Sequence, residues 1–305
     1  MTSPHLPITL VLAGALGLAA GGCQSQRTFS SPEEAAAALA AAAENENTSE
    51  LRAIFGPRAN ELRSGDPDAD RVDIASFRRQ IAQSRSIELD GDDVAIINIG
   101  ADQWPFAVPV VKQVDGAWIF DTDAGIEEIE NRRIGRNELT VISACIAVFV
   151  AQDEYRSMDR DGDGVFEYAD RLLSTPGTRD GLYWESPGGL DPSPIGPALA
   201  MASVRTDDKG ERIPYAGYRF RLLECQGPSA PGGMRDYRDN GNLVNGWAVL
   251  AWPDQWDRTG VKSFLVSAHG VMYEADLGPD TSQVVTAFTC FDPSDEWTVV
   301  NLSED

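Results

Sequence analysis

The sequence predicts an α+β protein of two domains. Helical patterns fill most of residues 30–84, and short strand patterns follow as far as residue 122. One long helix pattern then begins at residue 125, and a second series of strand patterns occupies the C-terminal part. Helices and strands that occur in separate runs are typical of the α+β class. A chain of 305 residues is long enough for about two domains.

The first 22 residues have the pattern of a signal peptide. The stretch from Ile8 to Ala20 is apolar, too short for a stable membrane-spanning helix and of the right length for a signal-peptide core. Small residues precede Cys23, which resembles the bacterial lipobox, whose cysteine is acylated and becomes the mature N-terminus. No Lys or Arg precedes the apolar core, and Ala20 stands where a lipobox usually has Leu. The alternative is an ordinary secretory cleavage.

Acylation at Cys23 would place the chain in the bacterial cell envelope, with residues 23–29 as a lipidated tether. The acyl chains of such an anchor exceed the two signals that stable membrane attachment needs. We therefore expect a lipid-anchored protein on the periplasmic or outer-membrane face, with the membrane as a partner and an envelope protein as a second candidate. Nucleic acid is not expected as a partner, because a net charge of −23 repels phosphates.

Residues 30–124 are expected to form the first domain. Ser31 and Glu34 give a helix start signal ahead of an alanine-rich run. The Asp115-Gly116 pair is typical of a hairpin turn. Further helix patterns cover residues 48–56 and 70–84, and strand patterns cover residues 86–91, 93–100, 106–116 and 117–122.

Helices followed by a curved antiparallel sheet resemble the NTF2-like cone fold over residues 28–123. In that fold a helix packs on a bent sheet and can leave a pocket. Trp104 and Trp118 are the candidate pocket residues. The alternative is that both tryptophans are core aromatics.

Residues 125–305 are expected to form the second domain, which opens with a helix over residues 125–155. Its apolar residues form a stripe that needs a sheet packed against it. The stripe consists of Leu139, Ile142, Ile146 and Phe149, widened by Val141, Cys145 and Val148. A short helix pattern covers residues 168–174, and strand patterns cover residues 215–225, 246–253, 261–276 and 297–302. Hairpin turns are expected at Asn245-Gly246 and His269-Gly270.

One long helix followed by an antiparallel sheet resembles the globular head of type IV pilins and pseudopilins over residues 126–290. A pilin helix begins as a hydrophobic N-terminal anchor. Here the helix begins with the charged string EEIENRRIGRNE and follows another domain, so pilus assembly by helix packing is not expected.

Seven strings occur in order over residues 28–298: FSSPEEAAAAL, ADQWPF, NRRIGRNEL, DRDGDGVFEYA, LLSTPGTRDGLYW, GYRFRLLECQGPSAPGG and GVMYEADLGPDT. Together they resemble one uncharacterised bacterial family, the domain of unknown function 2950 family. The resemblance implies a secreted or lipid-anchored envelope protein. It implies no activity.

The string DRDGDGVFEYAD, residues 159–170, resembles a calcium loop of the EF-hand kind. In such a loop, alternate oxygen ligands converge around the ion and a glycine at position 6, here Gly164, allows a sharp bend. The candidate Ca²⁺ ligands are Asp159, Asp161, Asp163, the carbonyl of Val165, Glu167 and Asp170. The alternative is a metal-free acidic turn whose aspartates bond to the loop backbone. If calcium binds, a structural role is expected.

The remaining residues favour a non-catalytic protein with a binding or scaffolding role. His269 is the only histidine after the leader, and no nucleophile elbow surrounds a serine. The alternatives are a small-ligand-binding lipoprotein that uses the NTF2-like pocket, and an envelope hydrolase. Cys145 lies in an apolar segment and is expected to be a buried thiol, while the pairing among Cys145, Cys225 and Cys290 stays open.

Overall fold

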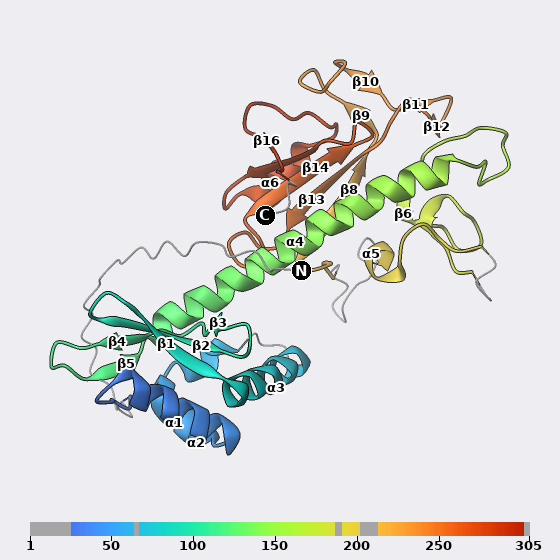
Figure 1. The fold of residues 1–305 in the computed structure, drawn as a ribbon. Helices are drawn as coiled ribbons and strands as arrows, with labels where there is room; N and C mark the ends of the chain where they lie inside the picture. Colours follow the sequence, from blue (N-terminus) through green and yellow to red (C-terminus); the bar gives the residue numbers. More distant parts are fainter. Residues whose placement is uncertain (1–25, 64–66, 187–190, 202–212, 302–305) are drawn as a thin grey trace. The chain divides into compact units, whose positions relative to one another are not determined.

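The computed structural model describes residues 26–63, 67–186, 191–201 and 213–301 (Figure 1). The expected signal peptide and Cys23 lie outside these residues. The chain contains helices and antiparallel sheets, which confirms the α+β class. It divides into two compact units, residues 1–132 and 133–305, and the division falls within one helix, α4 (Thr122–Arg156).

Unit 1 combines helices with an antiparallel sheet, at the positions where the sequence predicts them. Among its described residues the helices are α1 (Pro32–Glu44), α2 (Thr48–Phe55), the short 3₁₀ helix η1 (Ala59–Leu62) and α3 (Pro67–Gln83). The strands are β1 (Arg85–Asp90), β2 (Val94–Ile99), β3 (Trp104–Pro105), β4 (Val110–Lys112) and β5 (Trp118–Phe120). The sheet order is β1-β2-β4-β5, with β3 paired to β2.

Local signals in the sequence explain how these elements begin and turn. The hydroxyl of Ser31 accepts the Glu34 backbone N–H at 3.3 Å, which satisfies a donor at the start of α1. At the β4–β5 turn, Gly116 has φ +87° and donates its N–H to Gln113 at 2.8 Å. The Asp115 carboxylate accepts the N–H of Ala117 at 3.0 Å. The predicted hairpin turn is therefore confirmed, because its left-handed position is occupied by glycine.

Unit 2 is built on a second antiparallel sheet, of order β16-β15-β14-β13-β8 (Figure 1). Its strands are β8 (Tyr218–Leu223), β13 (Ala248–Pro253), β14 (Lys262–Ser267), β15 (Met272–Asp276) and β16 (Thr298–Val299). Smaller pairs are β6 (Arg171–Leu173) with β7 (Gly181–Tyr183), β9 (Cys225–Gln226) with β10 (Arg235–Asp236), and β11 (Arg238–Asp239) with β12 (Asn242–Leu243). The described part of this unit also contains the short helices α5 (Pro197–Met201) and α6 (Thr281–Ala287).

The face of α4 that is buried in unit 2 matches the predicted stripe in part. Val141, Cys145 and Val148 are fully buried in one core cluster with the strands of the sheet. Ile142 and Phe149 of the predicted stripe are partly buried and pack against this cluster, whereas Leu139 is 60% exposed and Ile146 is 41% exposed, so the prediction is wrong at these two positions. The predicted apolar face is broad, and periodicity alone does not show which of its edges is exposed.

The buried side of α4 also carries a polar side chain that bonds to the neighbouring chain segment. Gln152 is fully buried and bonds both backbone groups of Ala169, at 2.9 Å and 2.8 Å.

Among the described residues, α4 is the one helix long and apolar enough, by length and composition, to cross a membrane. A core helix meets the same criterion, and one third of this apolar window is buried.

The helix predicted over residues 168–174 is also wrong, because this segment is extended and contains β6. The N–H of Tyr168 donates to the carbonyl of Leu243 at 2.9 Å, and the side chain of Gln152 holds Ala169. Tertiary partners thus take the backbone groups that a helix would use, and they outweigh a weak local propensity. The acidic loop consequently lies between a helix and a strand.

The structure confirms one of the two later hairpin turns and corrects the other. The N–H of Gly270 donates to Ser267 at 2.9 Å, between the paired strands β14 and β15. Asn245 and Gly246 lie between β12 and β13, which do not pair with each other, so the turn predicted there is wrong. The hairpin turn lies instead at Asn240 (φ +51°) and Gly241 (φ +96°), between β11 and β12. Both turns are Asn-Gly pairs, and the sequence does not tell which one joins the strands.

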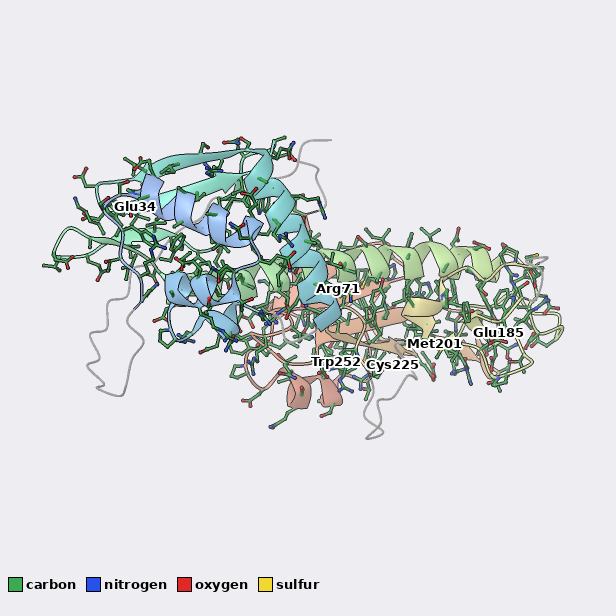
Figure 2. The ribbon with its side chains drawn as sticks, turned by 90° about the horizontal axis from the view of Figure 1, so that it is seen from below. Glu34, Arg71, Glu185, Met201, Cys225 and Trp252 are labelled. Carbon is green, nitrogen blue, oxygen red and sulfur yellow. A yellow bond between two sulfur atoms is a disulfide. The ribbon has the colours of Figure 1, made fainter. Side chains whose placement is uncertain are left out.

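The three cysteines that follow Cys23 in the sequence form one disulfide and leave one free thiol. Cys225 and Cys290 form a disulfide between positions 65 residues apart (Figure 2). Cys145 is a free thiol in the core, as the sequence predicts. Burial raises the pKa of this thiol to about 12, so it is not a nucleophile at neutral pH.

Candidate functional site

The acidic loop begins three residues after α4 ends at Arg156. Its first half brings three carboxylates together. One oxygen each from Asp159, Asp161 and Asp163 lies within 4.8 Å of the others. This is the convergence that the alternating sequence pattern predicts.

Backbone N–H groups hold the three aspartates in place. The Asp159 carboxylate accepts from Gly162 at 2.7 Å and from Gly164 at 2.9 Å. Both glycines have positive φ, which turns their N–H groups inward. These N–H groups lower the pKa of Asp159, because they stabilise its charged form. Asp161 accepts from Asp163 at 3.3 Å, and Asp163 accepts from Val165 at 2.7 Å.

In the second half of the loop the carboxylates have protein partners. Glu167 accepts the N–H of Leu243 at 3.1 Å, and burial raises its pKa. Asp170 forms ion pairs with Arg171 at 2.9 Å and with Arg238 at 3.2 Å. The predicted ligands thus divide into a converging group, Asp159, Asp161 and Asp163, and two side chains that serve the surrounding fold.

The chemistry of the first half fits a hard cation. Carboxylate and carbonyl oxygens are the ligands that calcium prefers, and calcium tolerates irregular, flexible geometry. Three aspartate side chains and the carbonyl of Val165 would hold the ion. It would neutralise three like charges that otherwise repel one another.

The two tryptophans of the expected pocket lie on neighbouring parts of the unit 1 sheet but in different environments. Trp118 on β5 is 8% exposed and belongs to the core cluster, with the Lys112 ammonium 5.9 Å from its ring centroid. Trp104 on β3 is 44% exposed, with the Arg132 guanidinium 5.5 Å from its ring centroid. Neither of them lines the two clefts described below.

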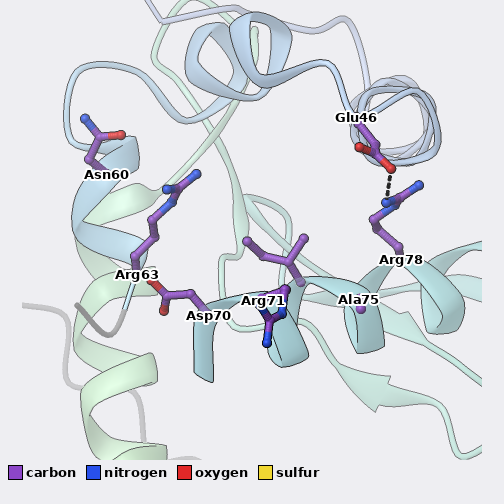
Figure 3. Close-up of a pocket in the computed structure, with 8 residues that line it drawn as sticks. Glu46, Asn60, Arg63, Asp70, Arg71, Ala75 and Arg78 are labelled. Atoms are coloured by element: carbon purple, nitrogen blue, oxygen red, sulfur yellow. Dashed lines mark hydrogen bonds and ion pairs between the residues drawn. The ribbon is translucent and has the colours of Figure 1, made fainter. Parts of the chain in front are cut away.

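Unit 1 has an open cleft of about 630 Å³ along α3 (Figure 3). It is lined by Glu46, Asn60, Arg63, Asp70, Arg71, Ile74, Ala75 and Arg78. Arg78 and Glu46 form an ion pair of 2.5 Å across it. Asp70 and Arg71 also have partners. These four charged side chains therefore interact within the protein.

Unit 2 has a smaller cleft of about 360 Å³, which the sequence analysis missed. We call it the basic cleft. It is lined by Arg156, Tyr168, Gln226, Arg235, Tyr237, Val244, Asn245, Gly246, Ala268 and His269. These residues come from the end of α4, the end of the acidic loop, β9, β10, the segment before β13 and the β14–β15 turn. No spacing in the sequence reveals such a site, because tertiary folding alone brings these segments together.

The fold and these sites define an α+β protein of two units, with an acidic loop and a basic cleft in the second unit. The chain belongs to the family described as protein of unknown function (DUF2950), whose family model matches residues 26–300. This match confirms the family resemblance of the sequence strings. No curated protein and no solved structure matches the chain.

Proposed function

We propose that this chain is a non-catalytic binding or scaffolding protein of the bacterial envelope, with a structural calcium ion in the loop of residues 159–170. The observation that carries the proposal is the convergence of the Asp159, Asp161 and Asp163 carboxylates within 4.8 Å. Clustered exposed carboxylates repel one another, so a cation that neutralises them stabilises the loop.

The position of the loop supports a structural role for the ion. The Asp163 carboxylate accepts from the side chain of Asn242 at 2.5 Å, and Glu167 accepts from Leu243 on the same strand, β12. A bound ion would therefore hold the acidic loop, which follows α4, against strand β12. An ion in this position would stabilise the fold and stay bound, as in extracellular modules whose Kd for calcium is about 0.1–1 mM.

The proposed envelope location rests on the leader pattern and Cys23. The disulfide between Cys225 and Cys290 supports it, because disulfides persist in oxidising compartments and are rare in the cytosol. The lipid on Cys23 and the periplasmic or outer-membrane position are part of this proposal.

We also propose finer fold relationships for the two units. The order of three helices followed by a bent antiparallel sheet supports an NTF2-like unit 1. The long helix α4 followed by a five-stranded antiparallel sheet supports a pilin-head-like unit 2.

Equilibrium dialysis against calcium tests the proposed ion. The lipid-free chain, residues 24–305, is expected to take up one calcium with a Kd of about 0.1–1 mM. Asp161→Asn with Asp163→Asn removes two charges but keeps an oxygen that accepts each loop N–H, so it should weaken binding without unfolding the loop. Asp295→Asn with Glu296→Gln removes two exposed charges elsewhere in unit 2 and is the matched control. Absence of uptake at millimolar calcium, or equal loss in both variants, would contradict the calcium site.

A second test addresses the envelope role. The full-length chain expressed in bacteria should partition with membranes, and Cys23→Ser should release it. Cross-linking in intact cells should then recover a specific envelope partner. A full-length protein that stays in the cytosol would contradict the location.

A further inference from the structure

We infer that the basic cleft of unit 2 binds a small, sugar-sized molecule that carries a carboxylate or a phosphate. This inference deepens the proposed binding role by naming a ligand class, and so it rests on that role. Anion binding does not require the calcium ion as a ligand, because the cleft is lined by residues other than the three converging aspartates.

The charge of the cleft is opposite to that of the whole chain. The chain has 48 acidic and 25 basic residues, yet none of the residues lining the cleft is acidic. Arg156, Arg235 and His269 all line it. An anion is therefore attracted to this cleft in a protein whose overall charge repels anions.

The two arginines are available for a ligand. Within the described part of the chain, neither Arg156 nor Arg235 forms an ion pair with an acidic side chain. Other arginines of unit 2 do so, and Arg238, for example, pairs with Glu224 at 2.7 Å and with Asp170 at 3.2 Å. A guanidinium matches the planar geometry of carboxylate and phosphate oxygens and binds them through paired hydrogen bonds.

Arg156 is held in position before any ligand binds. Its guanidinium donates to the Tyr168 hydroxyl at 2.8 Å and lies 4.8 Å from the centroid of that ring. Among the described residues, this is the one hydrogen bond that the guanidinium forms, so its other N–H groups can donate to a ligand. A side chain that is already oriented loses less conformational entropy when a ligand binds.

Tyr237 supplies an independent sign of a missing partner. The residue is 1% exposed, and its hydroxyl has no hydrogen-bond partner among the described residues. A buried hydroxyl without a partner is unfavourable by about 1–3 kcal/mol. Burial raises the pKa of Tyr237 to about 12, so the hydroxyl is a proton donor at neutral pH. Because Tyr237 lines the cleft, we assign an oxygen of the bound ligand as the acceptor of this hydrogen bond.

The remaining polar residues form a rigid frame. Gln226 is 2% exposed and donates both amide hydrogens to backbone carbonyls, of Pro231 at 2.9 Å and Gly233 at 2.6 Å. Its carbonyl oxygen lies 3.4 Å from Nε2 of His269. The disulfide at the adjacent Cys225 further restrains this strand. The histidine therefore lies against a buried side chain that is held by two hydrogen bonds.

The size of the cleft limits the ligand. A volume of about 360 Å³ is at the lower end of the range of roughly 300–1,000 Å³ found for small-molecule sites. The rings of Tyr168 and Tyr237 with Val244 and Ala268 give it an apolar part beside the cations. A sugar acid and a sugar phosphate both offer an oxyanion on a compact body that can pack on an aromatic ring.

Titration calorimetry on the chain of residues 24–305 tests this inference. The probes are D-glucuronate, D-glucose 6-phosphate and neutral D-glucose, each at the same ionic strength. We expect saturable binding of one or both anions and none of glucose. Tighter binding of glucuronate would identify a carboxylate ligand, and tighter binding of the phosphate ester would identify a phosphorylated one.

Three variants connect binding to the cleft. Arg156→Gln with Arg235→Gln should lower the affinity for the anion at least about 10-fold, which is the low end of the effect of losing a hydrogen bond to a charged group. Arg85→Gln with Arg258→Gln has the same charge change on exposed arginines outside the cleft and should bind as the unaltered protein does. Tyr237→Phe removes a buried hydroxyl that has no partner among the described residues, so it should leave the melting temperature of the free protein the same or higher while it weakens anion binding.

The inference is overturned if no anion binds at concentrations of about 10 mM, ten times a weak millimolar Kd. It is also overturned if both arginine pairs weaken binding equally, since that result would reflect net charge alone. Calcium uptake and membrane partitioning are measured separately. Failure of the anion test would therefore leave the calcium and envelope proposals standing, and the reverse is also true.

Discussion

The guanidinium of Arg156 donates a 2.8 Å hydrogen bond to the hydroxyl of Tyr168 and so joins the two ends of the acidic loop. Arg156 is the last residue of α4, and Tyr168 follows the first five predicted calcium ligands. Both residues also line the basic cleft. The two proposed sites therefore share a structural element, and the state of one should affect the other.

This shared contact predicts that calcium strengthens anion binding. A loop held by calcium keeps Tyr168 in place, and Tyr168 orients Arg156. Removal of calcium should weaken the anion by about 5-fold, the low end of typical coupling between sites. The effect is measured by calorimetric titration of the anion without calcium and with about 5 mM calcium, which is several times the expected calcium Kd.

Tyr168→Phe is the variant that isolates this coupling. It removes the hydroxyl that accepts from Arg156 and keeps the ring. Anion affinity should then become independent of calcium. If the unaltered protein binds the anion equally with and without calcium, the loop and the cleft are uncoupled.

A second prediction concerns Glu138, which attaches α4 to the sheet of unit 2. Its carboxylate accepts the N–H groups of both Val261 and Lys262 at 2.9 Å. Glu138→Ala leaves two partly buried donors without a partner, and each such donor is unfavourable by about 1–3 kcal/mol. We expect unit 2 to lose about 2–4 kcal/mol in urea unfolding.

Matched variants separate this contact from a general effect of charge. Glu138→Gln keeps one acceptor oxygen and should lose less stability than Glu138→Ala. Asp153→Ala removes an exposed acid from the same helix and should change little. Equal stability of Glu138→Ala and Asp153→Ala would show that the contact contributes nothing.

The sequence predicts the elements with strong local signals. The helix that begins after Ser31 and the turn at Gly116 follow from a side-chain cap and from a left-handed glycine. Cys145 is buried, as its apolar neighbours suggest. The errors occur where tertiary contacts decide. Gln152 was an ordinary polar residue in the pattern, yet it is fully buried and fixes the extended segment at Ala169.

The two candidate sites differ in the same way. The acidic loop is a local motif, so spacing alone predicts the convergence of Asp159, Asp161 and Asp163. The basic cleft has no local signature, because Arg156 and Arg235 are far apart in sequence. Within the described residues, the absence of an ion pair at Arg156 and Arg235 and of a partner for the Tyr237 hydroxyl are properties of the folded protein alone.

A third prediction concerns pH in the calcium-free protein. The pKa of Glu167 is raised above its ordinary value of 4.5, chiefly by burial. An acid with a raised pKa contributes stability below its unfolded pKa, and that stability is lost as the pH rises through the folded value. Glu167→Gln keeps an acceptor for the N–H of Leu243 and removes the charge. It should therefore raise the melting temperature at pH 7 relative to the unaltered protein, and much less at pH 3.5.

Asp159 provides the opposite sign. Its pKa is lowered below 3.8 by the N–H groups of Gly162 and Gly164. Its stabilising contribution is present above the unfolded pKa and is lost as the pH falls through the folded pKa. Asp159→Asn should be less stable than the unaltered protein at pH 7, with a difference that shrinks on acidification below pH 4. Melting curves between pH 3.5 and 7 measure both variants, and a change of the same sign in both would contradict the assignment.

The last prediction concerns the cysteines. The Cys225–Cys290 disulfide closes a loop of 65 residues, for which the chain-entropy model gives about 4 kcal/mol of stabilisation. Cys225→Ala with Cys290→Ala should therefore lower the melting temperature of unit 2 by roughly 10 °C. Since Gln226 adjoins Cys225 and positions His269, the same variant should also weaken the anion in the basic cleft.

Thiol labelling of residues 24–305 tests the pairing directly. Cys145 is fully buried and its pKa is raised to about 12, so the native protein should label at no cysteine. Unfolding without a reductant should expose Cys145 alone, and unfolding with a reductant should label Cys225 and Cys290 as well. Labelling of all three cysteines without a reductant would contradict the disulfide. Such a result would also mean that no disulfide restrains Gln226 beside the cleft.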